Sequence, residues 1–477
     1  MVAGPDPRRW KALALVCAAF FMTVLDVSIV NVALPTIGDK LDFSKDSLQW
    51  VITAYALTFG GFLMLGGRAA DYLGRRRVFM VGVALFTLAS LVCGLSSSEG
   101  MLIGARAVQG LGAAIITPAA LSIVSTTFDE GAERNKALGI WGAIGGSGAA
   151  VGVLLGGVLT KYLGWEWIFF VNVPVGAAAL ALTTRYVRES RIEVPERRYD
   201  PFGAVSVTAG LVLLVYAISK APFDGWATTR TVLLLVGSAL LLAAFLVTER
   251  SVRDPIMPYR IFRVRTVAGA NAVGALLGAV IFSNFFVLTL YVQNVLHYSP
   301  LKTGLTFVAT AGTAVVSAVV AQALTTRVGA KPVMAAGLAL MTGGMLWYAH
   351  IPVDGHYAPD LLPGYLMVGV GIAFSFVPVA IAALAGVDAE EAGLASGLIN
   401  TTQQIGGAIG VAIASTLWTS HFKHAVAHGT PVPVALTDGY KLAFWVIAGL
   451  GAAALVTALT LIRREELAEA PAVAPVA

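Results

Sequence analysis

Charged residues are scarce in this sequence. Asp, Glu, Lys and Arg make up 12% of the 477 residues, whereas 57% of the residues are hydrophobic. So few charges cannot cover the surface of a water-soluble protein of this length. No hydrophilic stretch is long enough to fold as a soluble domain, which excludes a separate catalytic domain in water.

Cysteine is nearly absent as well. Cys17 and Cys93 both fall inside hydrophobic runs, so we expect two packing residues and no disulfide. The sequence has no P-loop, cysteine cluster or nucleophile elbow. Three histidines at helical spacing, His421, His424 and His428, are interpreted as solvated side chains. We therefore expect no enzymatic activity, no catalytic residue, no bound metal and no cofactor.

Long hydrophobic runs dominate the chain instead. About 20 apolar residues in a helix cross the roughly 30 Å hydrocarbon layer of a membrane. The runs do not alternate as barrel strands do, so they predict an all-α polytopic membrane protein. The first run is too long for a signal peptide and is interpreted as an uncleaved span. Fourteen runs have this character: 12–37, 48–66, 78–98, 101–127, 137–160, 167–184, 201–219, 231–248, 266–296, 303–326, 332–349, 361–387, 392–420 and 442–462.

The distribution of positive charge predicts the orientation. Loops on the same side as the N-terminus hold most of the 32 Lys and Arg residues, and such loops favour the cytoplasm. An even number of spans then places both termini in the cytoplasm, in a multi-pass protein of the inner (plasma) membrane. The net charge of +5 is interpreted as this topology signal and not as a surface for nucleic acid.

Two parts of the chain resemble each other. "ALGIWGAIGGSGAAVG" in the fifth run matches "ASGLINTTQQIGGAIG" in the thirteenth at an offset of 258, and Gly74 matches Gly329 at an offset of 255. The matches predict two related six-helix bundles, 1–187 and 266–463. Residues 188–265 add cytoplasmic linkers and two inserted helices, and 464–477 form a disordered tail. Parallel repeats are typical of transporters that alternate access around a central site.

Four motifs carry a family resemblance. They are "LDVSIVNVALP" (25–35), "GRAADYLGRRR" (67–77), "RAVQGLGAA" (106–114) and "GAIGGSGAAVGVLLGG" (142–157). The sequence resembles the major facilitator superfamily, and within it the fourteen-span drug:proton antiporters. The resemblance implies the major facilitator fold with two inserted helices. It also implies that the partners of the protein are a small amphiphilic substrate, protons and the lipid bilayer. We expect the protein to be a monomer.

The second motif predicts a conformational latch. Gly67 and Gly74 permit a tight turn between two helices. The resemblance implies that Asp71, with Arg75 and Arg76 beside it, holds the two halves in the outward-facing state. The arginines alone would also fit a purely topological role.

The fourth motif places small residues where helices approach closely. We expect these glycines to act in packing and gating and not in chemistry. The resemblance implies that they meet the thirteenth span, with its own Gly406, Gly407 and Gly410, across the two halves. The gating glycines are Gly145, Gly146, Gly148, Gly152 and Gly156.

Two charged residues lie inside the runs, Asp26 and Arg106. A lone charge at the bilayer centre costs at least about 2.5–3.5 kcal/mol, so such residues face a partner or a wet cavity. Low polarity favours the neutral acid and a guanidinium favours the carboxylate. We therefore interpret Asp26 as the proton carrier for which protons and substrate compete, tuned by Arg106 and by Gln109 one turn away. A static buried pair is the alternative.

Several polar and aromatic residues in the runs are candidate substrate contacts. Helical spacing puts Asn400, Gln403 and Gln404 on one face of the thirteenth run. Interhelical hydrogen bonding is the alternative for the amides, and core or lipid-facing packing for the aromatic residues. One acid and several amides suit neutral or weakly charged amphiphiles better than dications. The candidates are Tyr55, Trp141, Asn284, Tyr291, Asn400, Gln403 and Gln404.

Together the patterns predict a proton-coupled efflux antiporter for drugs or antibiotics, powered by the proton gradient. A symporter or a lipid or metabolite exporter on the same fold remains an alternative. A membrane sensor that transports nothing is a second one.

Overall fold

The computed structural model describes residues 7–463, apart from 44, 49, 129–130, 191–199, 253–254, 256, 258 and 388–390. These described residues form helices and no strand. In chain order the elements are α1 (Arg9–Lys40), α2 (Lys45–Leu48), α3 (Trp50–Leu73), α4 (Arg75–Gly94), α5 (Glu99–Thr127), α6 (Ala132–Tyr162), α7 (Trp167–Phe170), α8 (Asn172–Tyr186), α9 (Pro201–Asp224), α10 (Thr229–Thr248), η1 (Tyr259–Arg263), α11 (Arg265–Asn294), α12 (Pro300–Val328), α13 (Ala330–Tyr348), η2 (Tyr357–Leu361), α14 (Leu362–Leu384), α15 (Ala392–Ala427) and α16 (Val432–Leu461).

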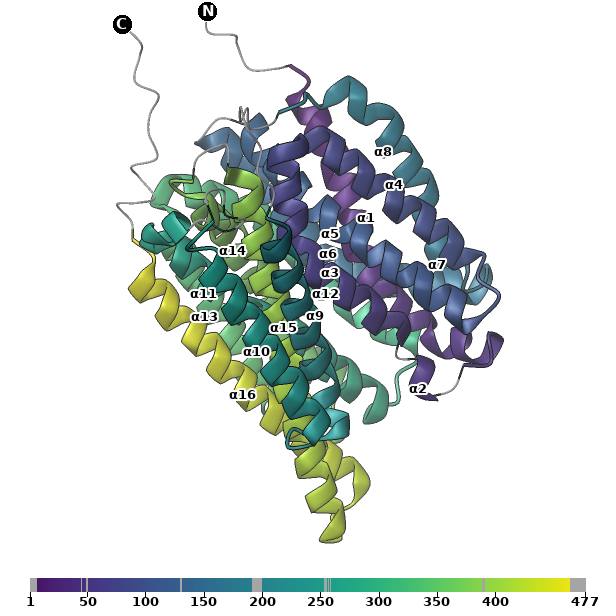
Figure 1. Ribbon diagram of the computed structural model, residues 1–477. Coiled ribbons are helices and arrows are strands. Elements are labelled where there is room, and N and C mark those ends of the chain that lie inside the picture. The colour runs from purple at the N-terminus through teal and green to yellow at the C-terminus, as the bar shows by residue number, and fades with distance from the viewer. Residues whose placement is uncertain are drawn as a thin grey trace, which may run out of the picture.

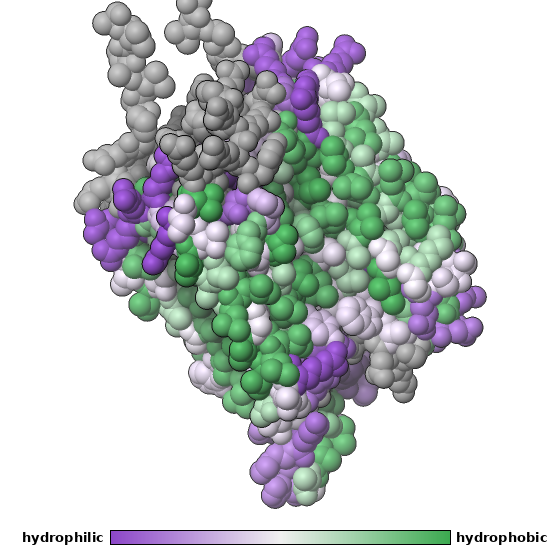
Figure 2. Space-filling view, viewed as in Figure 1, coloured by the Kyte–Doolittle hydropathy of each residue, from purple (hydrophilic) through white to green (hydrophobic). Residues whose placement is uncertain are grey.

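Every predicted hydrophobic run coincides with a helix or, for 167–184, with the pair α7 and α8. Within the described part of the chain, eleven helical segments are long and apolar enough to cross a membrane. The long helices α6, α13 and α15 pack among them. Hydrophobic side chains cover the middle of the molecular face, and hydrophilic ones gather toward its ends (Figure 2).

Local sequence explains where many of the helices begin and turn. The side chains of Ser98, Asp200 and Ser299 cap the N-termini of α5, α9 and α12 by accepting backbone N–H groups. Gly74 and Gly329 adopt positive φ, 106° and 90°, at the tight turns after α3 and after α12. Glycine reaches this conformation at little cost, so the equivalent turns in the two halves use the same device.

The helices form two bundles, α1–α8 and α11–α16, which lie side by side (Figure 1). α9 packs against both bundles, through α3 and α15, and α10 packs on α9. Close packing makes this contact possible, because a Cβ atom on Gly61 of α3 would come within 2.5 Å of Val212 in α9. The inserted pair therefore covers one seam between the bundles.

The internal repeat is visible in the packing. Gly152 of α6 faces Ser28 of α1, and Gly410 of α15 faces Ser283 of α11 in the same manner. Within each bundle, a glycine-rich helix thus packs on the first helix of its own half.

This arrangement corrects one expectation about the gating glycines. The predicted interface between the fifth and thirteenth spans is wrong, since α6 crosses to α12 and α14, whereas α15 crosses to α3 and α5. Gly148, Gly152 and Gly156 meet α1, and Gly145 faces Phe376 of α14. The glycine faces are already occupied inside each half, so they do not meet each other. The packing of Gly146 lies outside the described residues.

Candidate functional site

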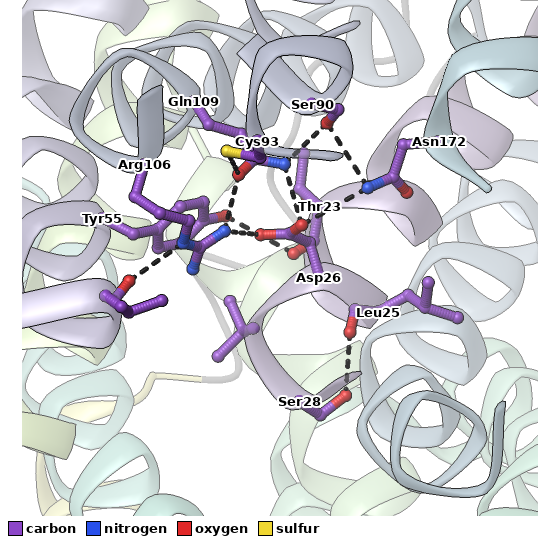
Figure 3. Close-up of polar contacts among 12 residues, drawn as sticks. Thr23, Leu25, Asp26, Ser28, Tyr55, Ser90, Cys93, Arg106, Gln109 and Asn172 are labelled. Atoms are coloured by element: carbon purple, nitrogen blue, oxygen red, sulfur yellow. Dashed lines mark hydrogen bonds and ion pairs between the residues drawn. The ribbon is translucent and has the colours of Figure 1, made fainter. Parts of the chain in front are cut away.

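Asp26 lies in the middle of α1 and is fully buried. Its carboxylate accepts three side-chain hydrogen bonds (Figure 3). Arg106 Nη1 donates to Oδ2 at 2.5 Å, Gln109 Nε2 donates to Oδ1 at 2.8 Å, and Asn172 Nδ2 donates to Oδ1 at 3.3 Å. The structure thus brings together the three residues that the sequence singled out for proton coupling and adds Asn172.

The same network ties together most of the first bundle. Arg106 Nη1 also donates to Gln109 Oε1 at 2.6 Å, and Arg106 Nε donates to the carbonyl of Val51 at 2.9 Å. Ser90 Oγ accepts from Gln109 at 2.6 Å and from Asn172 at 3.4 Å. α1, α3, α4, α5 and α8 therefore meet at one buried carboxylate. We call Asp26, Arg106, Gln109, Asn172 and Ser90 the Asp26 network.

Tyr55 belongs with this network and not with a substrate surface. It is 3% exposed, and its ring centroid lies 4.3 Å from the guanidinium carbon of Arg106. Its hydroxyl points to the carbonyl of Thr23, 3.5 Å away. Cation–π contact of this kind stabilises a buried guanidinium.

A cavity of about 500 Å³ lies between the two bundles. It runs from Thr117 and Phe376 toward Gln293, near the end of α11, and Thr303, in the first turn of α12. Its volume is in the range of small-molecule sites. Seven phenylalanines line it: Phe20, Phe59, Phe282, Phe285, Phe286, Phe307 and Phe376.

The cavity contains some of the predicted substrate contacts and leaves out others. Asn400, Gln403 and Gln404 line it, as helical spacing on one face of α15 allows. Trp141 is buried behind the wall and stacks on Phe20, with ring centroids 3.7 Å apart.

Two further candidates lie elsewhere. Asn284 is 2% exposed and does not line the cavity, and its Oδ1 has no hydrogen-bond partner in the described part of the chain. Tyr291 is buried and donates to the carbonyl of Pro352 at 2.6 Å, away from the cavity. Helical spacing groups residues on a face, but it does not say which face the cavity meets.

Asp26 does not line the cavity either. Thr23, Val27 and Asn31 of α1 do, so the two sites lie on different faces of one helix. The expected direct competition of protons and substrate for the Asp26 carboxylate does not fit this conformation, because α1 stands between them.

The predicted latch connects the two bundles at one end of the molecule. Asp71 is fully buried, accepts from Arg75 Nη2 at 2.8 Å, and accepts from the backbone N–H groups of Gly393 and Leu394 at 2.9 and 2.8 Å. A carboxylate of one half thus stabilises the N-terminus of α15 in the other half, where an anion is favoured.

The other latch residues shape that contact. A Cβ atom on Gly67 would collide with the carbonyl of Gly393, so the backbones touch here. Gly74 forms the turn after α3. Arg76 makes an ion pair with Glu189, with 3.7 Å between Arg76 Nε and Glu189 Oε2. The cavity extends away from this latch, toward the other end of α11 and α12.

A buried ion pair within one bundle, a cavity between two bundles and a latch across one end are the features of an alternating-access membrane transporter. The chain belongs to the Major Facilitator Superfamily, whose family model matches residues 16–411.

Relatives agree with this membership, and a solved structure shares the fold. The chain is 42% identical to the puromycin resistance protein pur8 of Streptomyces alboniger, over 91% of this chain and 87% of that protein. It is 41% identical to the cephamycin export protein CmcT of Amycolatopsis lactamdurans, over 85% and 84%. The human organic anion transporter MFSD10 shares the fold, with a TM-score of 0.68 and 15% identity over 95% of this chain and 100% of that chain.

Sequence reasoning missed Asn172 and Ser90. Both are neutral polar residues at positions where such residues commonly serve packing, so no pattern separated them from the rest. The two charges inside hydrophobic runs drew attention to the network, but its neutral members are visible only in three dimensions.

Proposed function

We propose that this protein is a proton-coupled antiporter that exports small amphiphilic compounds, antibiotics among them, through the plasma membrane. The puromycin resistance and cephamycin export proteins that it resembles support this substrate class. Both termini lie in the cytoplasm in this proposal, as the positive loops favour. The protein acts as a monomer, and the proton gradient supplies the energy without a cofactor.

The observation that carries the proposal is the double role of α1. One face of this helix holds Asp26 in its network, and the other face lines the cavity through Thr23, Val27 and Asn31. A change at the carboxylate therefore acts on the cavity wall through a single helix.

Proton binding changes the network in a defined way. A proton on Asp26 removes the negative charge opposite Arg106 and turns one acceptor oxygen into a donor. The bonds from Arg106, Gln109 and Asn172 then no longer match the carboxyl group. This loosens the attachment of α1 to α5 and α8, so that α1 can move with the cavity wall. Conversely, a substrate that holds α1 in its attached position favours release of the proton, because the intact network requires the carboxylate.

The latch distinguishes two conformations of the transport cycle, one that is closed at this end of the molecule and one that is open there. The bonds from Gly393 and Leu394 to Asp71 close the end of the molecule at which it lies, which is the cytoplasmic end in the proposed orientation. The cavity extends toward the outside in this arrangement. Breaking the latch permits the two bundles to rock and expose the cavity to the cytoplasm.

The proposal is tested with everted membrane vesicles that contain the protein and an acidic interior. Antiport predicts that puromycin accumulates inside as protons leave, and that accumulation stops when the gradient collapses. Asp26→Asn should abolish this accumulation but retain exchange of labelled for unlabelled puromycin. Asp224→Asn, which changes a partly exposed acid at the end of α9, is the matched control. Gradient-driven accumulation by Asp26→Asn at the normal rate would refute the assignment, and a symporter would require the opposite gradient.

A further inference from the structure

Three of the polar side chains that line the cavity are amides without a hydrogen-bond partner among the described residues. The side chains of Gln293, Gln403 and Gln404 line the cavity and make no hydrogen bond within the part of the chain that the structure describes. Each offers two N–H donors and one carbonyl acceptor. Polar groups in a largely apolar site that are left unpaired are costly, so these amides need water or a ligand.

The remaining cavity amides are partly engaged. Asn31 Nδ2 donates to the carbonyl of Val27 at 2.8 Å, and Asn400 Nδ2 donates to the carbonyl of Ser396 at 2.7 Å. Both donations go back to their own helix, which leaves the Oδ1 atoms of Asn31 and Asn400 as acceptors on the cavity surface.

The cavity wall contains no formal charge among the described residues. The buried charges Asp26 and Arg106 do not line the cavity and neutralise each other in an ion pair. A permanent cation that enters this cavity would lose its hydration and gain no counter-charge, and cation–π contact with the phenylalanine rings offsets only part of that loss. A wall of phenylalanines, in contrast, gains contact area from a flat aromatic ligand.

From these observations we infer that the cavity selects uncharged aromatic compounds that carry carbonyl together with amide or hydroxyl groups, and that it discriminates against permanent cations. This selection comes from the amides on α15, Asn400, Gln403 and Gln404, and from Gln293 on α11. The C-terminal bundle therefore recognises the polar groups of the substrate, and the N-terminal bundle contains the Asp26 network. The inference rests on the proposed function for the identity of the cavity as the substrate site. It does not depend on proton coupling.

Two planar three-ring probes of different charge test the selection. Anthraquinone-2-carboxamide is uncharged and has carbonyl and amide groups, whereas N-methylacridinium is a permanent cation. Binding is measured by equilibrium dialysis with the full protein in lipid nanodiscs, without any gradient, and protein-free nanodiscs correct for partition into lipid. The protein should bind the carboxamide at least about tenfold more tightly than the acridinium.

Substitutions on α15 assign this preference to individual side chains. Gln403→Ala and Gln404→Ala should each weaken carboxamide binding about three- to tenfold, the effect of one lost hydrogen bond. Gln404→Glu should tighten acridinium binding about tenfold or more, because it places a counter-charge in the cavity. Thr401→Val is the matched control, since Thr401 is buried on the same helix, away from the cavity, and bonds its own helix at Gly397.

The outcomes separate the inference from the proposed function. Equal binding of both probes by the unmodified protein would overturn the selection, as would unchanged acridinium binding by a Gln404→Glu variant that unfolds at the normal temperature. If the binding pattern holds but vesicles show no gradient-driven export, the proposed function fails and the site assignment stands. If export is gradient-driven but the binding pattern is absent, the inferred selection fails and the proposed function stands.

Discussion

Substitution of Asp71 should shift the equilibrium between the conformations that are closed and open at the latch end, by an amount that can be calculated. The Asp71→Ala substitution removes three hydrogen bonds, but they do not contribute equally to the free-energy difference between the closed and open conformations. The bond from Arg75 lies within the N-terminal bundle and does not cross to the other bundle, so we expect its loss to affect overall stability and not the closure of this end. The bonds from Gly393 and Leu394 cross between the bundles and exist only while this end is closed.

The expected shift follows from those two bonds. Helix-capping contacts contribute about 1 kcal/mol, and hydrogen bonds to a charged group contribute about 1.5–3 kcal/mol. Water replaces part of this in the open state, so we expect the closed state to lose about 1–3 kcal/mol. That corresponds to a change of about 5- to 150-fold in the ratio of closed to open molecules.

Distance measurements between spin labels report this ratio. Leu73 at the end of α3 and Val328 at the end of α12 are both exposed, lie at the latch end and belong to different bundles. The two native cysteines are buried, so Leu73→Cys and Val328→Cys provide the labelling sites. Asp71→Ala should move population toward the longer distance, whereas Glu133→Gln, which breaks the ion pair with Arg9 inside one bundle, should not. An unchanged distance distribution in Asp71→Ala would refute the view that this carboxylate holds the end closed.

Three further predictions follow from the packing and from the Asp26 network. Gly152→Ala should impair folding or transport, because the added methyl group collides with Ser28, whereas Gly104→Ala, which meets open space, should behave normally in a thermal-unfolding assay. Asn172→Ala should leave the protein folded but alter the pH dependence of puromycin transport in vesicles, since Asp26 loses one of its three donors, worth about 1 kcal/mol. Gly67→Ala should favour the open latch in the spin-label experiment, because its methyl group collides with the Gly393 carbonyl only when the bundles are closed. A normal pH profile for Asn172→Ala, or a closed latch in Gly67→Ala, would contradict the roles assigned here.

The sequence predicted the helices and singled out the two charged residues inside them for clear physical reasons. Apolar runs of sufficient length have few alternatives to helices in a membrane. Asp26 and Arg106 stood out because a charge in such a run requires a partner, and the structure places the two in contact.

The partners of the glycine faces could not be predicted in the same way. The repeat identifies Gly152 with Gly410, which shows that α6 and α15 are equivalent but not what each of them contacts. α6 packs on α1 and crosses to α12 and α14, whereas α15 packs on α11 and crosses to the equivalent helices α3 and α5, and only three-dimensional packing shows this.

The relation between Asp26 and the cavity was also beyond the sequence. Two turns of α1 contain Thr23, Asp26 and Val27, so their closeness in the sequence suggests that they belong to one site. Their side chains point to different faces, and Thr23 and Val27 line the cavity while Asp26 bonds to α5 and α8. In the proposed mechanism, coupling through the helix therefore takes the place of direct competition.

Proton release upon substrate binding tests that coupling most directly. The purified protein is placed in a weakly buffered detergent solution with a pH-indicator dye, and puromycin is added without any gradient. We predict that the unmodified protein releases protons when puromycin binds, and that Asp26→Asn binds puromycin but releases none. Equal release of protons by the two proteins would contradict the assignment of Asp26 as the group that links the cavity to the proton.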